Sequence, residues 1–188
     1  EKVMDWLDEI DDKAKKVGAV NCIVIREGKT KGYNTDIIGF SQSLLDFIPH
    51  DHHSMKALVF GSGGAAKAVI FVLQQLHIAY TQVSRNEVLG ELSYADLQEE
   101  HFKQHHLLIN TTPVGMFPHV DELLPLPYHF VKPYHYAFDL VYNPEKTSFL
   151  KACEAHGAHG QNGYPMLILQ AEAAYSLFTN PESPANPG

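Results

Sequence analysis

The sequence lacks a long hydrophobic run, a long basic run and a cysteine framework. Its longest apolar run, residues 68–73, is far shorter than the roughly 20 residues that a membrane-spanning helix needs. The formal net charge of −8 argues against non-specific attraction to nucleic acid or to an anionic membrane surface. The two cysteines, Cys22 and Cys153, show no C-x-x-C spacing, so we expect buried, reduced thiols.

The first residues also lack the layout of a signal peptide, because they are acidic and amphipathic rather than basic and then apolar. We therefore expect a cytoplasmic protein, monomeric or homodimeric, with no nucleic-acid or membrane partner. Apolar residues at positions 3, 7, 10 and 14 form one stripe at helical spacing. A helix that begins this early indicates the middle part of a larger protein.

Twelve histidines raise the question of a metal site, above all in residues 50–53 and 101–106. Neighbouring residues in a loop seldom converge on one ion, and the pair His101 and His105 has no clear third ligand close by. We expect no metal site here and interpret these histidines as solvated side chains.

The segment of residues 57–86 is the most informative part of the chain. Residues 57–60 predict a buried strand, which leads into a glycine turn, a helix and a second strand at residues 80–83. The turn residues are Gly61, Ser62, Gly63, Gly64 and Ala65. Missing side chains let backbone N–H groups approach a pyrophosphate, which then lies at the positive end of the helix. This order predicts half of a dinucleotide-binding fold.

The end of the second predicted strand indicates which dinucleotide binds. NAD-binding folds place an Asp or Glu about 20 residues beyond the glycines, where it accepts hydrogen bonds from the ribose 2′-hydroxyl. This chain has Ser84, Arg85 and Asn86 there. A guanidinium favours a 2′-phosphate, so we predict NADP rather than NAD. The alternative is an ordinary β-turn with Arg85 as a solvated charge, and the complete order of elements disfavours it.

Further strands and helices alternate after this unit. Residues 107–110 and 136–141 predict strands, and residues 94–98, 147–156 and 164–178 predict helices. An earlier hairpin is expected within residues 19–33, followed by a helix from residue 36. Alternation of this kind predicts an α/β fold, a Rossmann-like doubly wound parallel sheet, with ligands beyond the carboxyl ends of the strands.

Five polar, glycine-containing or capping segments lie at the boundaries of these elements. They cover residues 18–21, 34–36, 110–116, 139–144 and 162–171. One of them, Asn34-Thr35-Asp36, has a simple structural explanation as a helix cap. Together with the glycine turn, however, the set and order of segments resemble shikimate dehydrogenase, which reversibly reduces 3-dehydroshikimate to shikimate with NADPH in aromatic amino-acid biosynthesis. The resemblance runs over about residues 1–178.

The resemblance implies roles for individual residues. Asn21, Asp36 and Gln170 would hydrogen-bond the hydroxyls of shikimate, with Tyr142 nearby. The residues implied to line the NADP site are Gly61, Ser62, Gly63, Gly64, Ala65, Ser84, Arg85, Asn86, Thr111, Leu140 and Gly163. The family has Asn-Arg-Thr where this chain has Ser84-Arg85-Asn86, so Arg85 is the firm match.

The family also begins with a substrate domain that this chain does not match. That domain carries a serine pair that holds the carboxylate and a catalytic lysine, which pairs with the aspartate matching Asp36; Lys2 does not match this lysine. We therefore interpret residues 1–35 as a remnant of the substrate domain and residues 36–163 as the NADP-binding domain. Residues 164–179 would form a helix that returns to the substrate domain, and residues 180–188 a disordered tail.

Without the lysine, Asp36 would have no partner for proton transfer, so we expect the 188-residue chain to be inactive or nearly so. Two other functions stay open. One is a quinate/shikimate dehydrogenase or an enzyme that uses NAD. The other is a non-catalytic nucleotide-binding module, against which the presence of Asn21, Asp36 and Gln170 counts.

Overall fold

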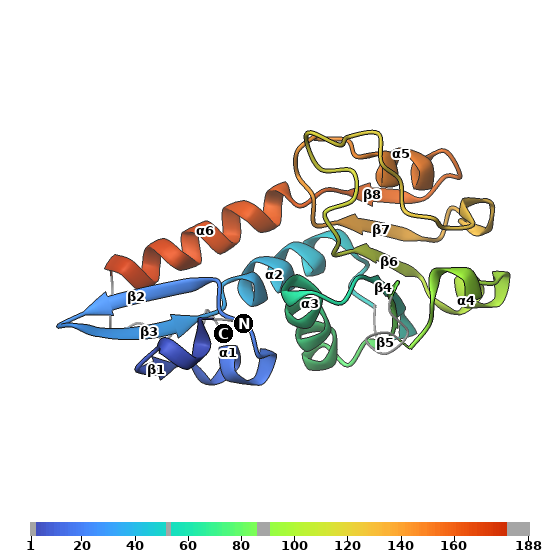
Figure 1. Cartoon of the computed structure of the whole chain (residues 1–188). Helices are drawn as coiled ribbons and strands as arrows, with labels where there is room; N and C mark the ends of the chain where they lie inside the picture. The colour runs from blue at the N-terminus through green and yellow to red at the C-terminus, as the bar shows by residue number, and fades with distance from the viewer. Residues whose placement is uncertain (1–2, 52–53, 86–90, 180–188) are drawn as a thin grey trace.

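The computed structural model describes residues 3–51, 54–85 and 91–179 of the chain. Two β-sheets lie at opposite ends of an elongated molecule, and long helices run between them (Figure 1). The larger sheet has five parallel strands, which confirms the predicted α/β fold with a doubly wound sheet.

The five-stranded sheet has the order β5-β4-β6-β7-β8. Its strands are β4 (Lys56–Phe60), β5 (Ala79–Val83), β6 (Leu107–Asn110), β7 (Tyr136–Asp139) and β8 (His159–Gln161). The chain proceeds from β4 to one side of the sheet and then returns to β6 on the other side. This reversal makes a switch point between β4 and β6, where open α/β sheets bind ligands beyond the carboxyl ends of the strands.

Helices cover both faces of this sheet. On one face the core contains Ala57 and Val59 of β4 with residues of α2 (Asp36–Phe47), α3 (Gly64–Gln75) and the beginning of α6 (Tyr164–Thr179). On the other face Leu58 and Phe60 pack with α4 (Glu99–Gln104) and α5 (Ser148–Glu154). Strands buried on both faces read as continuous apolar runs, and this is the signal that predicted β4 and β6.

The hairpin predicted within residues 19–33 is confirmed as β2 (Cys22–Arg26) and β3 (Lys29–Tyr33). The single helix predicted for the first residues is wrong. A 3-10 turn, η1 (Met4–Trp6), is followed by β1 (Glu9–Ile10) and α1 (Asp12–Val17). The helical stripe is interrupted because β1 pairs in parallel with β3, which completes a three-stranded sheet of order β1-β3-β2.

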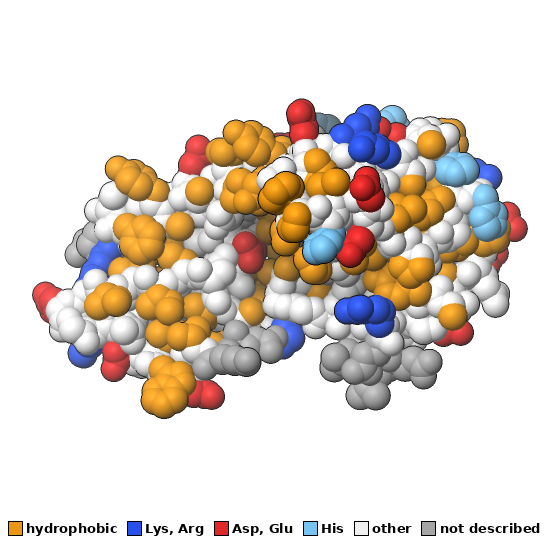
Figure 2. All heavy atoms as spheres, turned by 45° about the horizontal axis from the view of Figure 1, so that its top comes forward, with side chains coloured by type: hydrophobic (Ala, Val, Ile, Leu, Met, Phe, Trp, Pro, Cys, Tyr) orange, Lys and Arg blue, Asp and Glu red, His pale blue; other side chains and the backbone are white. Residues whose placement is uncertain are grey.

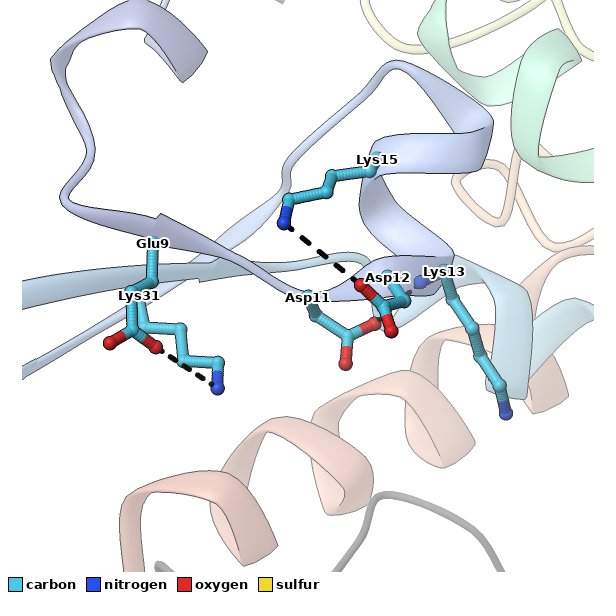
Figure 3. Close-up of polar contacts among 6 residues, drawn as sticks. All are labelled: Glu9, Asp11, Asp12, Lys13, Lys15 and Lys31. Carbon is cyan, nitrogen blue, oxygen red and sulfur yellow. Dashed lines mark hydrogen bonds and ion pairs between the residues drawn. The ribbon is translucent and has the colours of Figure 1, made fainter.

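Polar contacts lie on both sides of the point where β1 ends and α1 begins (Figure 3). Lys31 Nζ of β3 lies 3.3 Å from Glu9 Oε2 of β1. Asp11 then caps α1, because its Oδ2 accepts a hydrogen bond of 2.9 Å from the Lys13 backbone N–H. A carboxylate at a helix start is a favourable cap, so the chain leaves the strand and begins the helix within two residues.

The other differences from the predicted elements are local. The predicted helix at residues 94–98 is a 3-10 turn, η3 (Tyr94–Asp96), before α4, and a further 3-10 turn, η4 (Tyr128–Phe130), precedes β7. The short strand β8 was not predicted because His159–Gln161 contains no apolar residue. No helix within the described residues has the length and apolar character that crossing a membrane requires.

Helix α6 joins the two sheets (Figure 1). It starts beyond β8, crosses α2 and ends beside β2, where Leu177 packs with Cys22 and Val24. Arg26 Nη2 donates a hydrogen bond of 2.6 Å to the carbonyl of Leu177. The two helix backbones cross closely at Gly39 of α2, where a Cβ would lie only 2.6 Å from the carbonyl oxygen of Met166 in α6.

Replacing Gly39 with alanine should therefore push α6 away from α2. Inserting a methyl group into a well-packed contact costs about 1–3 kcal/mol, so we expect Gly39→Ala to lower the free energy of unfolding by that amount in urea titrations. Gln42→Ala, at an exposed position of the same helix, is the matched control and should change stability by less than about 0.5 kcal/mol. Equal stability of the two variants would contradict a close crossing at Gly39.

Candidate cofactor and substrate site

A cavity of about 540 Å³ lies at the switch point, beyond the carboxyl ends of β4, β5 and β6. The residues that line it are Gly61, Ser62, Gly63, Ser84, Arg85, Tyr94, Thr111, Thr112 and Pro113. Six of them belong to the predicted NADP site, namely Gly61, Ser62, Gly63, Ser84, Arg85 and Thr111. The structure thus brings the glycine turn and the predicted 2′-phosphate residue to one cavity.

The glycine turn has its shape because the neighbouring strand ends approach it closely. Gly61 has a φ of +118°, and a Cβ there would lie 2.5 Å from Thr111 Oγ1, so only glycine fits without strain. Thr111 Oγ1 also donates a hydrogen bond of 2.7 Å to the Phe60 carbonyl. At Gly63, by contrast, nothing lies within 4 Å of a Cβ, so the backbone is open to a ligand.

Helix α3 starts directly at Gly64, and Ala65 is its second residue. The first N–H groups of a helix have no acceptor within the helix and carry its positive dipole end, which suits a pyrophosphate. Ser62 and Ser84 lie on the two strand ends beside this helix, with their hydroxyl oxygens 3.2 Å apart. Arg85 is exposed at the rim, whereas Asn86 lies outside the described residues.

The predicted substrate residues also converge. Asn21 Oδ1 accepts a hydrogen bond of 2.9 Å from the backbone N–H of Thr35. Thr35 Oγ1 lies 3.3 Å from Asn21 Oδ1 and 3.1 Å from Gln170 Oε1 of α6. Three segments that are far apart in the sequence therefore meet at one threonine, directly before Asp36.

Thr35 is the residue that sequence reasoning missed, because it was considered only as a helix cap. Its side chain makes no capping hydrogen bond to α2, and the residue is buried, with 1% exposed. Its hydroxyl instead positions the side chains of Asn21 and Gln170. No pattern along the chain distinguishes this role from capping, since both use a threonine before an aspartate.

Asp36 is the first residue of α2, and burial raises the pKa of its carboxyl group. A hydrogen bond from the Asn21 side chain acts in the opposite direction and lowers this pKa. Within the described residues, no lysine or arginine contributes to the shift. The Asp36 carboxyl group is therefore buried and accepts a hydrogen bond from one amide, and no cationic side chain of the described residues shifts its pKa.

The predicted substrate residues and the glycine turn are neighbours. Ala19, two residues before Asn21, lies 3.8 Å from the position of a Cβ on Gly64. The Asn34 side-chain amide donates a hydrogen bond of 3.0 Å to the Ala19 carbonyl. The segment that carries Asn21 therefore packs against the first residue of α3, so a bound dinucleotide and the polar cluster would adjoin.

A buried carboxyl group holds the ends of β6 and β7. Asp139 Oδ1 accepts hydrogen bonds from Asn110 Nδ2 at 2.9 Å and from the Val141 backbone at 3.0 Å, and Oδ2 accepts one from Thr147 Oγ1 at 2.6 Å. Asn110 Oδ1 in turn accepts from the backbone N–H of Thr112 at 2.9 Å. This network fixes the cavity wall at Thr111 and Thr112.

The last predicted site residues follow β7. A Cβ on Gly163 would clash with the Leu140 carbonyl, so only glycine allows the start of α6 to pass the end of β7. Leu140 and Gly163 thus contact each other and do not line the 540 Å³ cavity. Tyr142, which is 46% exposed, lies two residues after Leu140 in the sequence.

His105 and His135 are buried and make structural contacts, so the expectation of a solvated side chain is wrong for His105. His105 Nε2 lies 3.1 Å from Thr81 Oγ1, and buried His135 lies with Nε2 2.9 Å from the Phe102 carbonyl. Burial lowers the pKa of both imidazoles. No group of three or more His, Cys, Asp or Glu side chains within the described part of the chain could hold a metal ion. His52 and His53 lie outside it.

A glycine turn at the switch point of a doubly wound sheet, with an arginine after the second strand, defines the class of dinucleotide-binding α/β proteins. The shikimate dehydrogenase (NADP(+)) of Caldanaerobacter subterraneus subsp. tengcongensis is 38% identical over 194 residues, which cover 95% of this chain and 69% of the relative. The chain belongs to the shikimate dehydrogenase family. No protein-family model matches the chain.

Two solved structures extend this comparison. Shikimate 5-dehydrogenase from Thermus thermophilus, in complex with NADP(H) and shikimate, aligns with a TM-score of 0.82 at 33% identity over 95% of this chain and 69% of that one. Quinate dehydrogenase from Corynebacterium glutamicum, in complex with NAD, aligns with a TM-score of 0.82 at 27% identity over 98% of this chain and 71% of that one. Both share the fold of the described chain.

The buried network at Asp139 predicts a pH-dependent stability. Burial raises the pKa of this carboxyl from 3.8 to about 6, so the folded protein binds the proton more tightly than the unfolded chain. This contribution stabilises the folded state at low pH and is lost as the pH rises through about 6. Asp139→Asn removes it, so the stability of the variant relative to the wild type should rise between about pH 4 and about pH 7.

Urea unfolding of both proteins at a series of pH values measures this difference. The matched control is Asp46→Asn, the same replacement at an exposed position of α2. If the Asp139→Asn difference depends on pH no more steeply than that of the control, Asp139 does not titrate with a raised pKa in the folded protein.

Proposed function

We propose that this chain binds NADP(H) in the 540 Å³ cavity and shikimate or 3-dehydroshikimate beside it, and serves the reversible NADPH-dependent reduction of 3-dehydroshikimate. The observation that carries the proposal is the convergence of Asn21, Thr35 and Gln170 beside Asp36. Amide and hydroxyl groups of this kind recognise a polyhydroxylated ring, and a protein that bound only a nucleotide would have no use for them.

The residues divide the work as follows. Asn21 and Gln170 orient the substrate through hydrogen bonds to its hydroxyls, and Asp36 accepts a hydrogen bond from the reacting hydroxyl. When bound, NADP supplies the acceptor for the hydride. Oxidation of the alcohol also requires a group that removes the hydroxyl proton, and an aspartate alone is a poor match in pKa for that step near neutral pH.

In the family, a lysine pairs with the aspartate that matches Asp36. Since no lysine or arginine shifts the pKa of Asp36 within the described residues, we expect the 188-residue polypeptide to bind its ligands but to turn over slowly. A positioned proton-transfer group contributes about 10²–10⁴-fold in rate, so turnover should fall short of an active relative by that factor. A steady-state assay with shikimate and NADP⁺, with the Thermus thermophilus enzyme alongside, measures the difference; comparable turnover would contradict the expectation.

Arg85 carries the preference for NADP. Its guanidinium lies at the rim of the cavity that also contains the glycine turn, where a 2′-phosphate can form charge-assisted hydrogen bonds. Replacing it with Arg85→Gln should weaken NADP⁺ binding by about ten- to 100-fold in calorimetry and leave NAD⁺ binding within about twofold. Lys151→Gln, an exposed charge on α5, is the control and should change neither. If the wild type binds no NADP⁺, the proposed function is wrong.

A quinate/shikimate dehydrogenase is the second candidate, and the structural similarity to a quinate dehydrogenase in complex with NAD favours it. The two candidates differ in the substrate that the polar cluster accepts and in the cofactor. Titration of quinate against shikimate, each with NAD⁺ and with NADP⁺, distinguishes them. A non-catalytic nucleotide-binding module would bind neither acid.

The proposed division of the chain follows from the same geometry. Residues 1–35 and 164–179 would belong to the substrate side and residues 36–163 to the cofactor side, because α6 leaves the large sheet and ends at the hairpin.

Large apolar side chains lie exposed on the end of the molecule that contains α6 and the small sheet (Figure 2). They include Trp6, Ile25, Tyr164, Tyr175 and Phe178. Such a surface suits contact with further protein in a monomer or a homodimer. The free, buried Cys22 and Cys153 fit a reducing compartment such as the cytoplasm.

A further inference from the structure

Tyr94 is an aromatic residue of the cofactor cavity to which neither the sequence patterns nor the proposed reaction gives a role. Its ring stacks on Phe60, with ring centroids 6.3 Å apart and planes inclined by 23°. Phe60 is fully buried and is the last residue of β4, directly before Gly61. The tyrosine ring is therefore supported from the strand that leads into the glycine turn.

The backbone around Tyr94 is fixed as well. Ser93 Oγ donates a hydrogen bond of 2.6 Å to Asp96 Oδ2, and the same oxygen lies 3.3 Å from the Ser93 backbone nitrogen. These contacts form a capping box for the 3-10 turn η3. With the backbone capped and the ring stacked on Phe60, Tyr94 is held in place before any ligand binds.

Tyr94 lies on the border between two cavities, of which the second is the more apolar. The 540 Å³ cavity contains the glycine turn, and a second cavity of about 520 Å³ has a mostly apolar wall. That wall includes Val114, Met116, Phe117, Leu123 and Leu124. The two cavities share four lining residues, namely Arg85, Tyr94, Thr112 and Pro113. A ligand with phosphates at one end and a flat apolar ring at the other would fit these two cavities, with its phosphates at the glycine turn and its ring at the apolar wall.

Charge and ring chemistry at the border are complementary to an adenosine 2′-phosphate. Burial raises the pKa of the Tyr94 hydroxyl, and the positive charge of Arg85 acts in the opposite direction, so the two side chains share one electrostatic environment. An aromatic face binds any flat base, whereas a guanidinium binds phosphate. Two different parts of one nucleotide would thus be recognised by neighbouring residues.

We propose, on the basis of the proposed function, that the Tyr94 ring stacks on the adenine of the dinucleotide and so supplies affinity that NADP and NAD share. Arg85 then discriminates between them through the 2′-phosphate. The two residues have separable effects, because one changes the affinity for both cofactors and the other changes their ratio. Tyr94 is a binding and positioning residue in this arrangement and does not touch the reacting atoms.

Calorimetric titration of the 188-residue chain with NADP⁺, NAD⁺ and nicotinamide mononucleotide tests this. Tyr94→Leu should weaken the binding of both dinucleotides by the same factor, about 5- to 150-fold, and leave nicotinamide mononucleotide unchanged. Tyr94→Phe keeps the ring and should stay within about twofold of the wild type for every ligand. Arg85→Gln should change the ratio of NADP⁺ to NAD⁺ affinity, which Tyr94→Leu should leave intact.

The outcomes are distinct. Unchanged binding of both dinucleotides by Tyr94→Leu overturns the stacking, and so does a selective loss of NADP⁺ binding in Tyr94→Phe, which would place the hydroxyl on the 2′-phosphate. Absence of NADP⁺ binding by the wild type overturns the proposed function instead. Should Tyr94→Leu fail to fold, NMR of ¹³C-tyrosine-labelled wild type with adenosine 2′,5′-bisphosphate replaces the titration. The Tyr94 ring resonance, assigned by comparison with Tyr94→Phe, should shift because of the ring current of the stacked base. The absence of a shift at saturation rejects the proposal.

Discussion

The close crossing of α2 and α6 is the constraint on which the site depends. Asp36 begins one of these helices and Gln170 lies in the middle of the other, so their meeting requires the two backbones to approach at Gly39. Thr35 then makes the approach specific, because its hydroxyl lies between Gln170 and Asn21. Gly39 allows the two helices to pack closely, and the buried hydroxyl of Thr35 links Gln170 to Asn21. Distant parts of the sequence thereby meet in a single cluster.

Two buried polar residues have corresponding roles on the two sides of the site. Thr35 joins the segments of the proposed substrate side, and Asp139 joins the strand ends that form the cavity wall. Each satisfies several donors or acceptors from segments that no local interaction would join. A buried polar group without partners is costly, so hydrogen bonds within these two networks favour one arrangement of the loops and disfavour others. The site is thereby shaped largely before its ligands arrive.

Much of the fold followed from sequence because its signals are local. The apolar runs that became β4 and β6, and the glycine turn after β4, depend on neighbouring residues alone. Strand β1 could not be predicted from the sequence, because Glu9 and Ile10 are extended through pairing with Lys31 and Gly32. The roles of Thr35, Asp139 and Tyr94 depend on partners many residues away, and no periodicity records such partners. Asn86 stays a prediction because it lies outside the described residues.

The far edge of the large sheet has a consequence for how copies of this chain meet. Strand β8 forms that edge with only three residues, and the Glu154 carboxylate lies against Gly160 while pairing with Lys146. A strand of only three residues is a poor template for another strand, so this edge resists the open-ended sheet growth that leads to aggregates. This sheet edge therefore limits strand-to-strand polymerisation, whatever covers the exposed apolar side chains elsewhere on the molecule.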